Sequence, residues 1–201
     1  MQPVICLASN SPRRRELLSQ IGVPHVVAGA DIDETVLPGE TPRAYVTRLA
    51  REKALAIRGT GQRLPVLAAD TTVVVDGKIF GKPRDRAEAI YMLGELAGRK
   101  HEVLTAIALA GTARGVSERL SSNVVGFRKI SPEECAAYWE TGEPRDKAGG
   151  YAIQGLGAVF VESLTGSYSA VMGLPLFETG ELLQAAGIRF WNGASPGGER
   201  A

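Results

Sequence analysis

A short turn near the amino end of the chain combines hydroxyl and guanidinium groups that could bind an anion. Ser9, Ser11, Arg13 and Arg14 lie where an apolar run passes into a helical pattern. A helix N-terminus offers free backbone N–H groups to phosphate, and arginine binds phosphate oxygens through parallel hydrogen bonds. Because consecutive helical residues diverge by about 100°, the arginines from Arg13 to Arg15 cannot all reach one ligand. We predict a polyphosphate site here, with a solvated basic helix face as the alternative.

Carboxylates occur in two separate segments. Asp70 directly follows the apolar run 66–69, which predicts a buried strand, and α/β proteins place ligand-binding groups at the carboxyl ends of strands. Asp31, Asp33 and Glu34 lie on a proline-punctuated segment that we expect to be a loop. Carboxylates from separate segments are usual ligands of Mg²⁺, together with water and substrate phosphates. Asp70 is therefore a candidate catalytic base or metal ligand; the alternatives are a turn-capping aspartate and a solvated acidic loop.

Two lysines and one glutamine complete the set of candidate residues. Lys53 lies in a helical pattern and Lys82 between a glycine and a proline, so rigid neighbours would hold both cations in place. Fixed cations stabilise charge that develops on phosphate in a transition state, although surface lysines have the same local sequence. Gln154 lies in the glycine-rich segment 147–157, where the backbone can approach a ligand closely. Its amide both donates and accepts hydrogen bonds, so it could read a base edge.

The elements that must position these residues follow from apolar periodicity and turn signals. Strands are predicted at 3–8, 25–28, 66–69 running on to 75, 103–110, 121–130 and 159–161. Helices are predicted at 13–21, 42–59, 85–96, 131–142 and 174–186. Ser11, Thr41 and Ser131 stand where N-caps are expected. Early alternation of strands and helices, followed by clustered strands, predicts an α/β fold with a mixed central sheet flanked by helices.

Composition excludes several classes of function. The 23 basic and 22 acidic residues nearly cancel, so no broad positive field would hold nucleic acid or an anionic membrane. We expect a cytoplasmic protein, because no stretch reaches the roughly 20 apolar residues of a membrane helix and no secretion signal is evident. Two cysteines and two histidines, all widely spaced, argue against a disulfide framework, a zinc site and a Ser-His triad.

Together these segments resemble the Maf family of nucleoside triphosphate pyrophosphatases, also called septum-formation-inhibitor-like proteins. The likeness covers nearly all of residues 4–188 and rests on motifs in the family's order and spacing: Leu7 to Arg14, Ile32 to Glu34, Leu49 to Ala54, Ala69 to Thr71, Gly81 to Pro83, Asp146 to Gly155 and Gly166 to Ser169. One departure is Ala170 to Met172, where the family more often has Asn-Val-Val.

The resemblance implies an elongated α/β fold similar to that of inosine triphosphatases, with two lobes of a single domain, residues 1–190, around a deep cleft. Residues 191–201 would form a flexible tail. It also implies hydrolysis between the α- and β-phosphates of a nucleoside triphosphate with a divalent cation, Mg²⁺ or Mn²⁺. A homodimer is the expected assembly.

The resemblance implies a role for each candidate residue that matches a family motif by position. Asp70 is the proton acceptor that activates water, and Asp70 with Glu34 would ligate the metal. The other charged and hydroxyl groups either hold the triphosphate or complete the charged ring: Ser9, Ser11, Arg13, Arg14, Glu34, Lys53 and Lys82.

Substrate choice in the family is associated with the positions of Arg13, Thr71 and Gln154. The segment Lys147 to Gly155 looks like the branch that acts on dTTP and UTP. A second branch acts on 7-methyl-GTP and typically has tryptophan at the Arg13 position. Two other functions stay open, a nucleotide-binding regulator of cell division with weak hydrolysis and a nucleotide-sugar or phosphosugar transferase.

Overall fold

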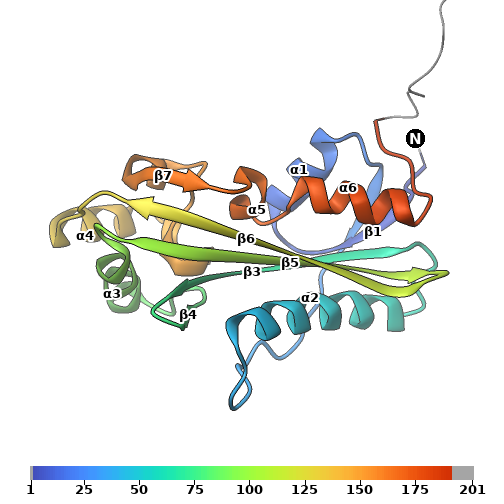
Figure 1. Ribbon diagram of the computed structural model, residues 1–201, viewed down its shortest axis with the longest axis horizontal. Coiled ribbons are helices and arrows are strands. Elements are labelled where there is room, and N and C mark those ends of the chain that lie inside the picture. Colours follow the sequence, from blue (N-terminus) through green and yellow to red (C-terminus); the bar gives the residue numbers. More distant parts are fainter. Residues whose placement is uncertain (1, 192–201) are drawn as a thin grey trace, which may run out of the picture.

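The apolar runs form one mixed sheet, which Figure 1 shows crossing the length of the molecule. The computed structural model describes residues 2–191. Its seven strands are β1 (Ile5–Ala8), β2 (His25–Ala28), β3 (Val66–Val75), β4 (Lys78–Phe80), β5 (Lys100–Thr112), β6 (Gly115–Phe127) and β7 (Val161–Thr165). Their order is β2-β1-β3-β5-β6-β7, with β4 paired to β3. The predicted α/β fold with a mixed sheet is confirmed.

The strand β3 is continuous through Asp70, so the prediction that Asp70 follows a strand is wrong. The antiparallel partner β5 pairs with β3 along its length and places Ala106 opposite Asp70. The parallel partner β1 pairs only up to Ala8, opposite Ala68, and β4 pairs from Val73 onward. In the described structure, residues 69–72 therefore have a neighbouring strand on one side only, and the gap is open to the segment that leaves β1.

The helices are α1 (Pro12–Gln20), α2 (Pro42–Gly59), α3 (Arg86–Leu96), α4 (Pro132–Glu140), α5 (Tyr168–Met172) and α6 (Leu176–Ala185). The Thr41 hydroxyl accepts a hydrogen bond from the Ala44 N–H, and Ser131 forms a capping box with Glu134. Ser11 occupies the N-cap position of α1, but its side chain makes no capping hydrogen bond. The hydroxyl of Ser11 is thus not used by its own helix.

Several element boundaries differ from the prediction. The strand β5 extends past the predicted 103–110 at both ends, whereas β6 begins before the predicted 121–130 and ends at Phe127, short of residue 130. The strand expected at 159–161 is a 3-10 turn, η3 (Leu156–Phe160), followed by β7. The helix expected at 174–186 is α6, and it is preceded by the short helix α5, which was not predicted and which ends at Gly173, where φ is 116°.

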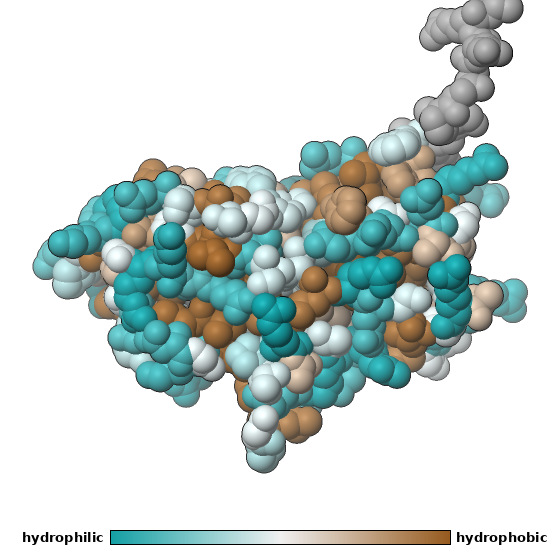
Figure 2. All heavy atoms as spheres, viewed as in Figure 1, coloured by the Kyte–Doolittle hydropathy of each residue, from teal (hydrophilic) through white to brown (hydrophobic). Residues whose placement is uncertain are grey.

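Alternate residues of β1 face opposite layers, as the two-residue period of a strand requires. Ile5 and Leu7 pack with α1 and α6, whereas Cys6 and Ala8 pack with α2. Figure 1 shows α2 below the sheet and α1 and α6 above it. On the face shown in Figure 2, apolar residues appear as separate patches among hydrophilic ones. Both cysteines, Cys6 and Cys135, are buried and free.

Among the described residues, none of the helices combines the length and the apolarity needed to cross a membrane. The single domain proposed for residues 1–190 stays a prediction. Apart from Trp191, the tail predicted at 191–201 lies outside the described residues.

His101 on β5 should make the stability of the fold depend on pH. Its side chain is 3% exposed, contacts Phe127 edge to face and lies 2.8 Å from the Tyr151 hydroxyl. Burial lowers the pKa of His101 to about 4, while the unfolded chain takes up the proton near its ordinary pKa, about 6.5. The folded state therefore binds fewer protons between these values.

The stabilisation associated with neutral His101 is fully present above the unfolded pKa and is lost as the pH falls toward 4. The free energy of unfolding should fall by up to about 1.4 kcal/mol per pH unit in this window. Urea unfolding of the wild type and His101→Gln at about pH 5 and pH 7 measures the difference. Equal pH dependence of the two proteins would contradict this account.

Candidate active site

One cavity of about 370 Å³ collects every predicted site residue. It opens where the gap in the sheet beside β3 meets the segment that follows β1. The predicted residues that line it are Ser9, Ser11, Arg13, Arg14, Glu34, Lys53, Asp70, Thr71, Lys82 and Gln154. The arginine-bearing turn and Asp70 thus share one cavity, the condition on which the sequence-based hypothesis depended.

The guanidinium group of Arg14 is held by neutral oxygens from three segments. Its Nε donates to the Gly173 carbonyl at 2.7 Å, and its two Nη atoms donate to Thr71 Oγ1 at 3.2 Å and Ser9 Oγ at 3.4 Å. Burial lowers the pKa of Arg14, while the charges of Asp70 and Glu34 oppose this shift. A fixed cation bonded to neutral groups keeps its charge available for an anionic ligand.

Asp70 and Thr71 reach the cavity from opposite faces of β3, because successive strand residues point in opposite directions. Asp70 shares its face with Ala68 and points toward α2, where Lys53 lies. Thr71 shares its face with the residues around α1 and contacts Arg14. Because β1 ends at Ala8, no strand of the described chain separates the two faces of the sheet directly beyond that residue, and the cavity is lined from both.

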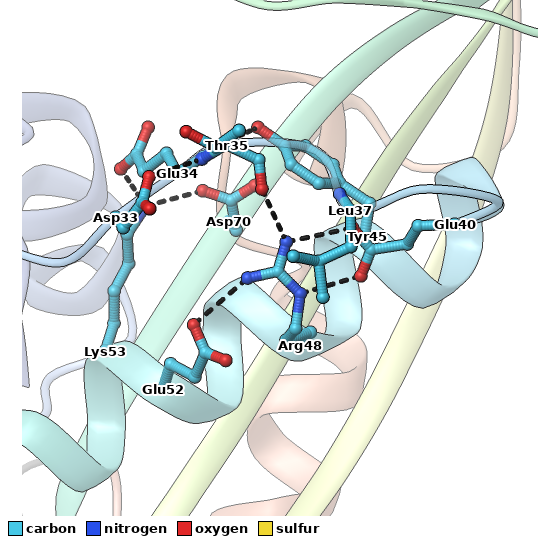
Figure 3. Close-up of polar contacts among 10 residues, drawn as sticks. All are labelled: Asp33, Glu34, Thr35, Leu37, Glu40, Tyr45, Arg48, Glu52, Lys53 and Asp70. Atoms are coloured by element: carbon cyan, nitrogen blue, oxygen red, sulfur yellow. Dashed lines mark hydrogen bonds and ion pairs between the residues drawn. The ribbon is translucent and has the colours of Figure 1, made fainter.

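Lys53 joins the two carboxylates of the site, as Figure 3 shows. Its Nζ lies 2.6 Å from Asp70 Oδ1 and 2.6 Å from Glu34 Oε1. Lys53 and Asp70 are both buried, with 8% and 7% of their surfaces exposed. Charged groups at such depth require partners, and here each carboxylate finds the same ammonium group.

The two carboxylates differ in proton affinity. Burial raises the pKa of Asp70 and outweighs the opposing charges of Lys53 and Arg14. Burial also acts to raise the pKa of Glu34, but the hydrogen bond and charge of Lys53 outweigh it and lower the pKa overall. Asp70 is therefore the more basic of the two carboxylates, while Glu34 keeps its negative charge.

The loop that carries Glu34 is fixed by α2. The Tyr45 hydroxyl donates to the Glu34 carbonyl at 3.0 Å, and Arg48 donates to the Thr35 carbonyl at 3.0 Å and to Glu40 at 2.7 Å (Figure 3). The Arg48 hydrogen bond lowers the pKa of Glu40 to about 2. Both contacts hold the loop so that the Glu34 side chain can meet Lys53.

The predicted cluster of Asp31, Asp33 and Glu34 is only partly correct. Glu34 lines the cavity, whereas Asp31 and Asp33 do not. The Asp33 carboxylate instead accepts a hydrogen bond from the Thr35 N–H at 2.9 Å and closes a turn. Glu52, the neighbour of Lys53 on α2, pairs with Arg48 at 3.1 Å and does not line the cavity.

Three residues near the ligand groups were not singled out from the sequence. Asp146 and Lys147 line the cavity and pair with each other, and Asp146 lies 3.7 Å from Arg13. Their place at the start of the glycine-rich segment is the signal that could have found them. Thr105 is fully buried and lies 3.1 Å from Thr71, oxygen to oxygen; inside an apolar strand pattern it gives no such signal.

The carboxylates of Asp70 and Glu34 fit a hard divalent cation. Both oxygens converge on the position of one ammonium group, and oxygen ligands are what Mg²⁺ prefers. Between residues 2 and 191 no group of three or more His, Cys, Asp or Glu side chains could hold a metal. The remaining ligands would have to come from substrate phosphates and water, as is usual for Mg²⁺.

Fold and site together define an α/β protein whose cavity combines fixed cations with a buried, basic carboxylate. Comparison with known proteins identifies the family. The family model of Maf-like proteins matches residues 4–186. A dTTP/UTP pyrophosphatase of Saccharophagus degradans is 52% identical, covering 94% of this chain and 92% of that protein. One of Methylobacillus flagellatus is 55% identical, covering 92% and 93%. The chain belongs to the Maf-like protein family.

Solved structures give weaker likenesses. A Ham1 protein of Coxiella burnetii has a TM-score of 0.43 at 22% identity, covering 65% of this chain and 75% of that one. A nucleoside-triphosphatase of Mycobacterium abscessus, a dITP/XTP pyrophosphatase, has a TM-score of 0.43 at 19% identity, covering 90% and 93%.

Proposed function

We propose that this chain hydrolyses dTTP and UTP to the monophosphate and diphosphate, as a house-cleaning pyrophosphatase. The observation that carries the proposal is the cavity that Asp70 shares with Arg13 and Arg14, the arginines that would hold a triphosphate. Family relatives named dTTP/UTP pyrophosphatase, at about half identity over nearly the whole chain, support the substrate class.

In the proposed reaction, Arg13 and Arg14 bind phosphate oxygens, with the hydroxyls of Ser9 and Ser11 beside them. Asp70 accepts a proton from a water molecule, whose oxygen forms a bond to the α-phosphorus. The bond from that phosphorus to the bridging oxygen breaks, and the electron pair leaves with diphosphate. Raised basicity suits Asp70 to this role, since proton transfer is favoured when the pKa approaches the working pH.

Lys53 and Lys82 are proposed to stabilise charge that accumulates on the phosphates. Asp70 and Glu34 are the ligands proposed for Mg²⁺ or Mn²⁺. The bound cation would shield phosphate charge and polarise the phosphoryl oxygens. Because Lys53 bridges both carboxylates, it also keeps them in place when no substrate is bound.

The test of the proposed function is product analysis with purified protein and UTP. We expect UMP and diphosphate in equal amounts, dependent on Mg²⁺ or Mn²⁺, with no acceptor present. Turnover without an acceptor excludes a transferase, and rapid turnover excludes a regulator that only binds nucleotide. Preference for 7-methyl-GTP over UTP would assign the other branch of the family instead.

Gln154 is the proposed reader of the base. Its half-buried side chain lines the cavity beside Ile153 and Ala152. Gln154→Ala should lower kcat/KM for UTP by roughly 10-fold, the cost of a lost hydrogen bond to substrate, with less effect on a purine triphosphate. Parallel kinetics on UTP and GTP, with an unfolding curve for each protein, measure this. Equal losses on both nucleotides would reject a base-reading role.

The assembly and the location are also proposals. Membership in the family supports a homodimer, and the proposed substrates support a cytoplasmic enzyme that acts on the nucleotide pool. Thr71, which touches Arg14, is proposed to contribute to substrate choice together with Arg13.

A further inference from the structure

Two side chains outside the cavity hold the backbone on both sides of Gln154. The Tyr138 hydroxyl accepts a hydrogen bond from the Ala152 N–H at 3.2 Å. The Glu143 carboxylate accepts from the Leu156 N–H at 3.0 Å and the Gly157 N–H at 2.9 Å. The segment that carries Gln154 is thus fixed at points before and after it by residues from α4 and the turn that follows.

Tyr138 and Glu143 also bind each other, so the two anchor points form one unit. The Tyr138 hydroxyl donates to Glu143 Oε1 at 2.6 Å, within the range of a charge-assisted bond. Burial and the Glu143 charge raise the pKa of Tyr138. Burial acts to raise the pKa of Glu143, but the hydrogen bonds from Tyr138 and the two amides outweigh it. The phenol stays protonated and the carboxylate ionised.

The glycines of the segment make room for this unit. A Cβ at Gly155 would overlap with the Glu143 carboxylate, and a Cβ at Gly157 would crowd the Tyr138 hydroxyl. Neither glycine needs a left-handed backbone, since neither has φ in that region. Glycine is therefore required at both positions because the side chains of Glu143 and Tyr138 approach the backbone closely. A methyl group at either position would displace them.

We infer that Glu143 and Tyr138 are positioning residues for base selectivity, because they set the place of Gln154 in the cavity. This inference rests on the proposed function. Neither residue lines the cavity, so both would act only through the segment 152–157. Displacing a ligand-reading group by about 1 Å can reduce a rate by roughly 100-fold, so loss of the anchors should alter substrate choice without removing any catalytic group.

The test compares Glu143→Gln with the wild type on UTP and GTP. We expect the ratio of kcat/KM for UTP to that for GTP to fall roughly 10-fold, mainly through a higher KM for UTP. The matched control is Glu134→Gln on α4, the helix that precedes the turn of Glu143. Glu134 is also an ionised hydrogen-bond acceptor, in the capping box with Ser131, but it accepts from Arg128 and the Ser131 N–H and not from the segment 152–157. The ratio of kcat/KM for UTP to that for GTP should stay at the wild-type value in Glu134→Gln.

A double variant separates positioning from general loss of stability. In the Gln154→Ala background, Glu143→Gln should leave the UTP to GTP ratio unchanged, because the group that it positions is absent. Tyr138→Phe removes one of the three amide contacts and should lower the ratio less. Gly155→Ala, which displaces Glu143 from the other side, should reproduce the effect of Glu143→Gln.

The outcomes distinguish this inference from the proposed function. If the wild type does not hydrolyse UTP, the proposed function fails. If the wild type prefers UTP and folded Glu143→Gln keeps the same preference, the function stands and the positioning role is overturned. Additive effects of Glu143→Gln and Gln154→Ala on the ratio would overturn it as well.

Discussion

Asp70→Asn should lower kcat on UTP by about 1000-fold, within the range that a general base contributes, while the protein stays folded. The amide keeps the size of the carboxylate but cannot accept the proton from water. Burial raises the pKa of Asp70, which means that the ionised form is disfavoured in the folded state. A neutral amide at this position avoids that cost near neutral pH.

The same substitution should also change the free energy of unfolding, by an amount that depends on pH. A carboxyl group whose folded pKa is raised contributes stability below its unfolded pKa and loses it as the pH rises through the folded pKa. The free energy of unfolding of Asp70→Asn, relative to the wild type, should therefore increase as the pH rises above about 4, the ordinary pKa of an aspartate. Steady-state kinetics and urea unfolding on one preparation measure both effects.

Asp33→Asn is the matched control for this prediction. Asp33 is a carboxylate close in sequence to Glu34, yet it lies outside the cavity and accepts a hydrogen bond from the Thr35 N–H. An asparagine side chain can make the same turn, so kcat should stay within about twofold. Wild-type turnover by Asp70→Asn, or an equal loss in Asp33→Asn, would remove Asp70 from the role of base.

Much of the site could be predicted from the sequence because its residues stand at readable places. Ser9 to Arg14 follow an apolar run and begin a helix, and Asp70 directly follows the apolar run 66–69. Polar side chains beside buried apolar runs do not contribute to the hydrophobic core, so a role in ligand binding or catalysis is the natural interpretation. Order and spacing of the motifs then predicted the family, and residues 4–186 match its model.

Other features depend on tertiary contacts that no local pattern records. β3 continues through Asp70 because β5 pairs with it on one side, whereas the apolar run alone ends at Ala69. Thr105 is read as an ordinary strand residue until its hydroxyl is seen to donate to the Ala170 carbonyl at 2.8 Å. Glu143 reaches amides far along the chain, and such contacts are visible only after folding.

Arg14→Lys should lower kcat/KM for UTP by roughly 100-fold, about the loss of one preorganised donor in an active site. The guanidinium group donates at once to the Gly173 carbonyl, Thr71 Oγ1 and Ser9 Oγ, which lie in three separate segments. A lysine ammonium keeps the charge but has a single nitrogen, so it cannot bridge these oxygens in the fixed planar geometry of arginine. Loss should appear in both kcat and KM, because the same group is proposed to bind phosphate and also connects three segments of the cavity.

Arg15→Lys supplies the control, since Arg15 is the next residue of α1, is exposed and does not line the cavity. It carries the same charge one residue further along α1, so long-range electrostatics alone would make the two variants alike. If the hydrogen-bond geometry of the Arg14 guanidinium group is what activity requires, Arg14→Lys loses activity and Arg15→Lys keeps it. Comparable kinetics in the two variants would show that net charge near the turn suffices, and the role of Arg14 as a fixed donor would have to be abandoned.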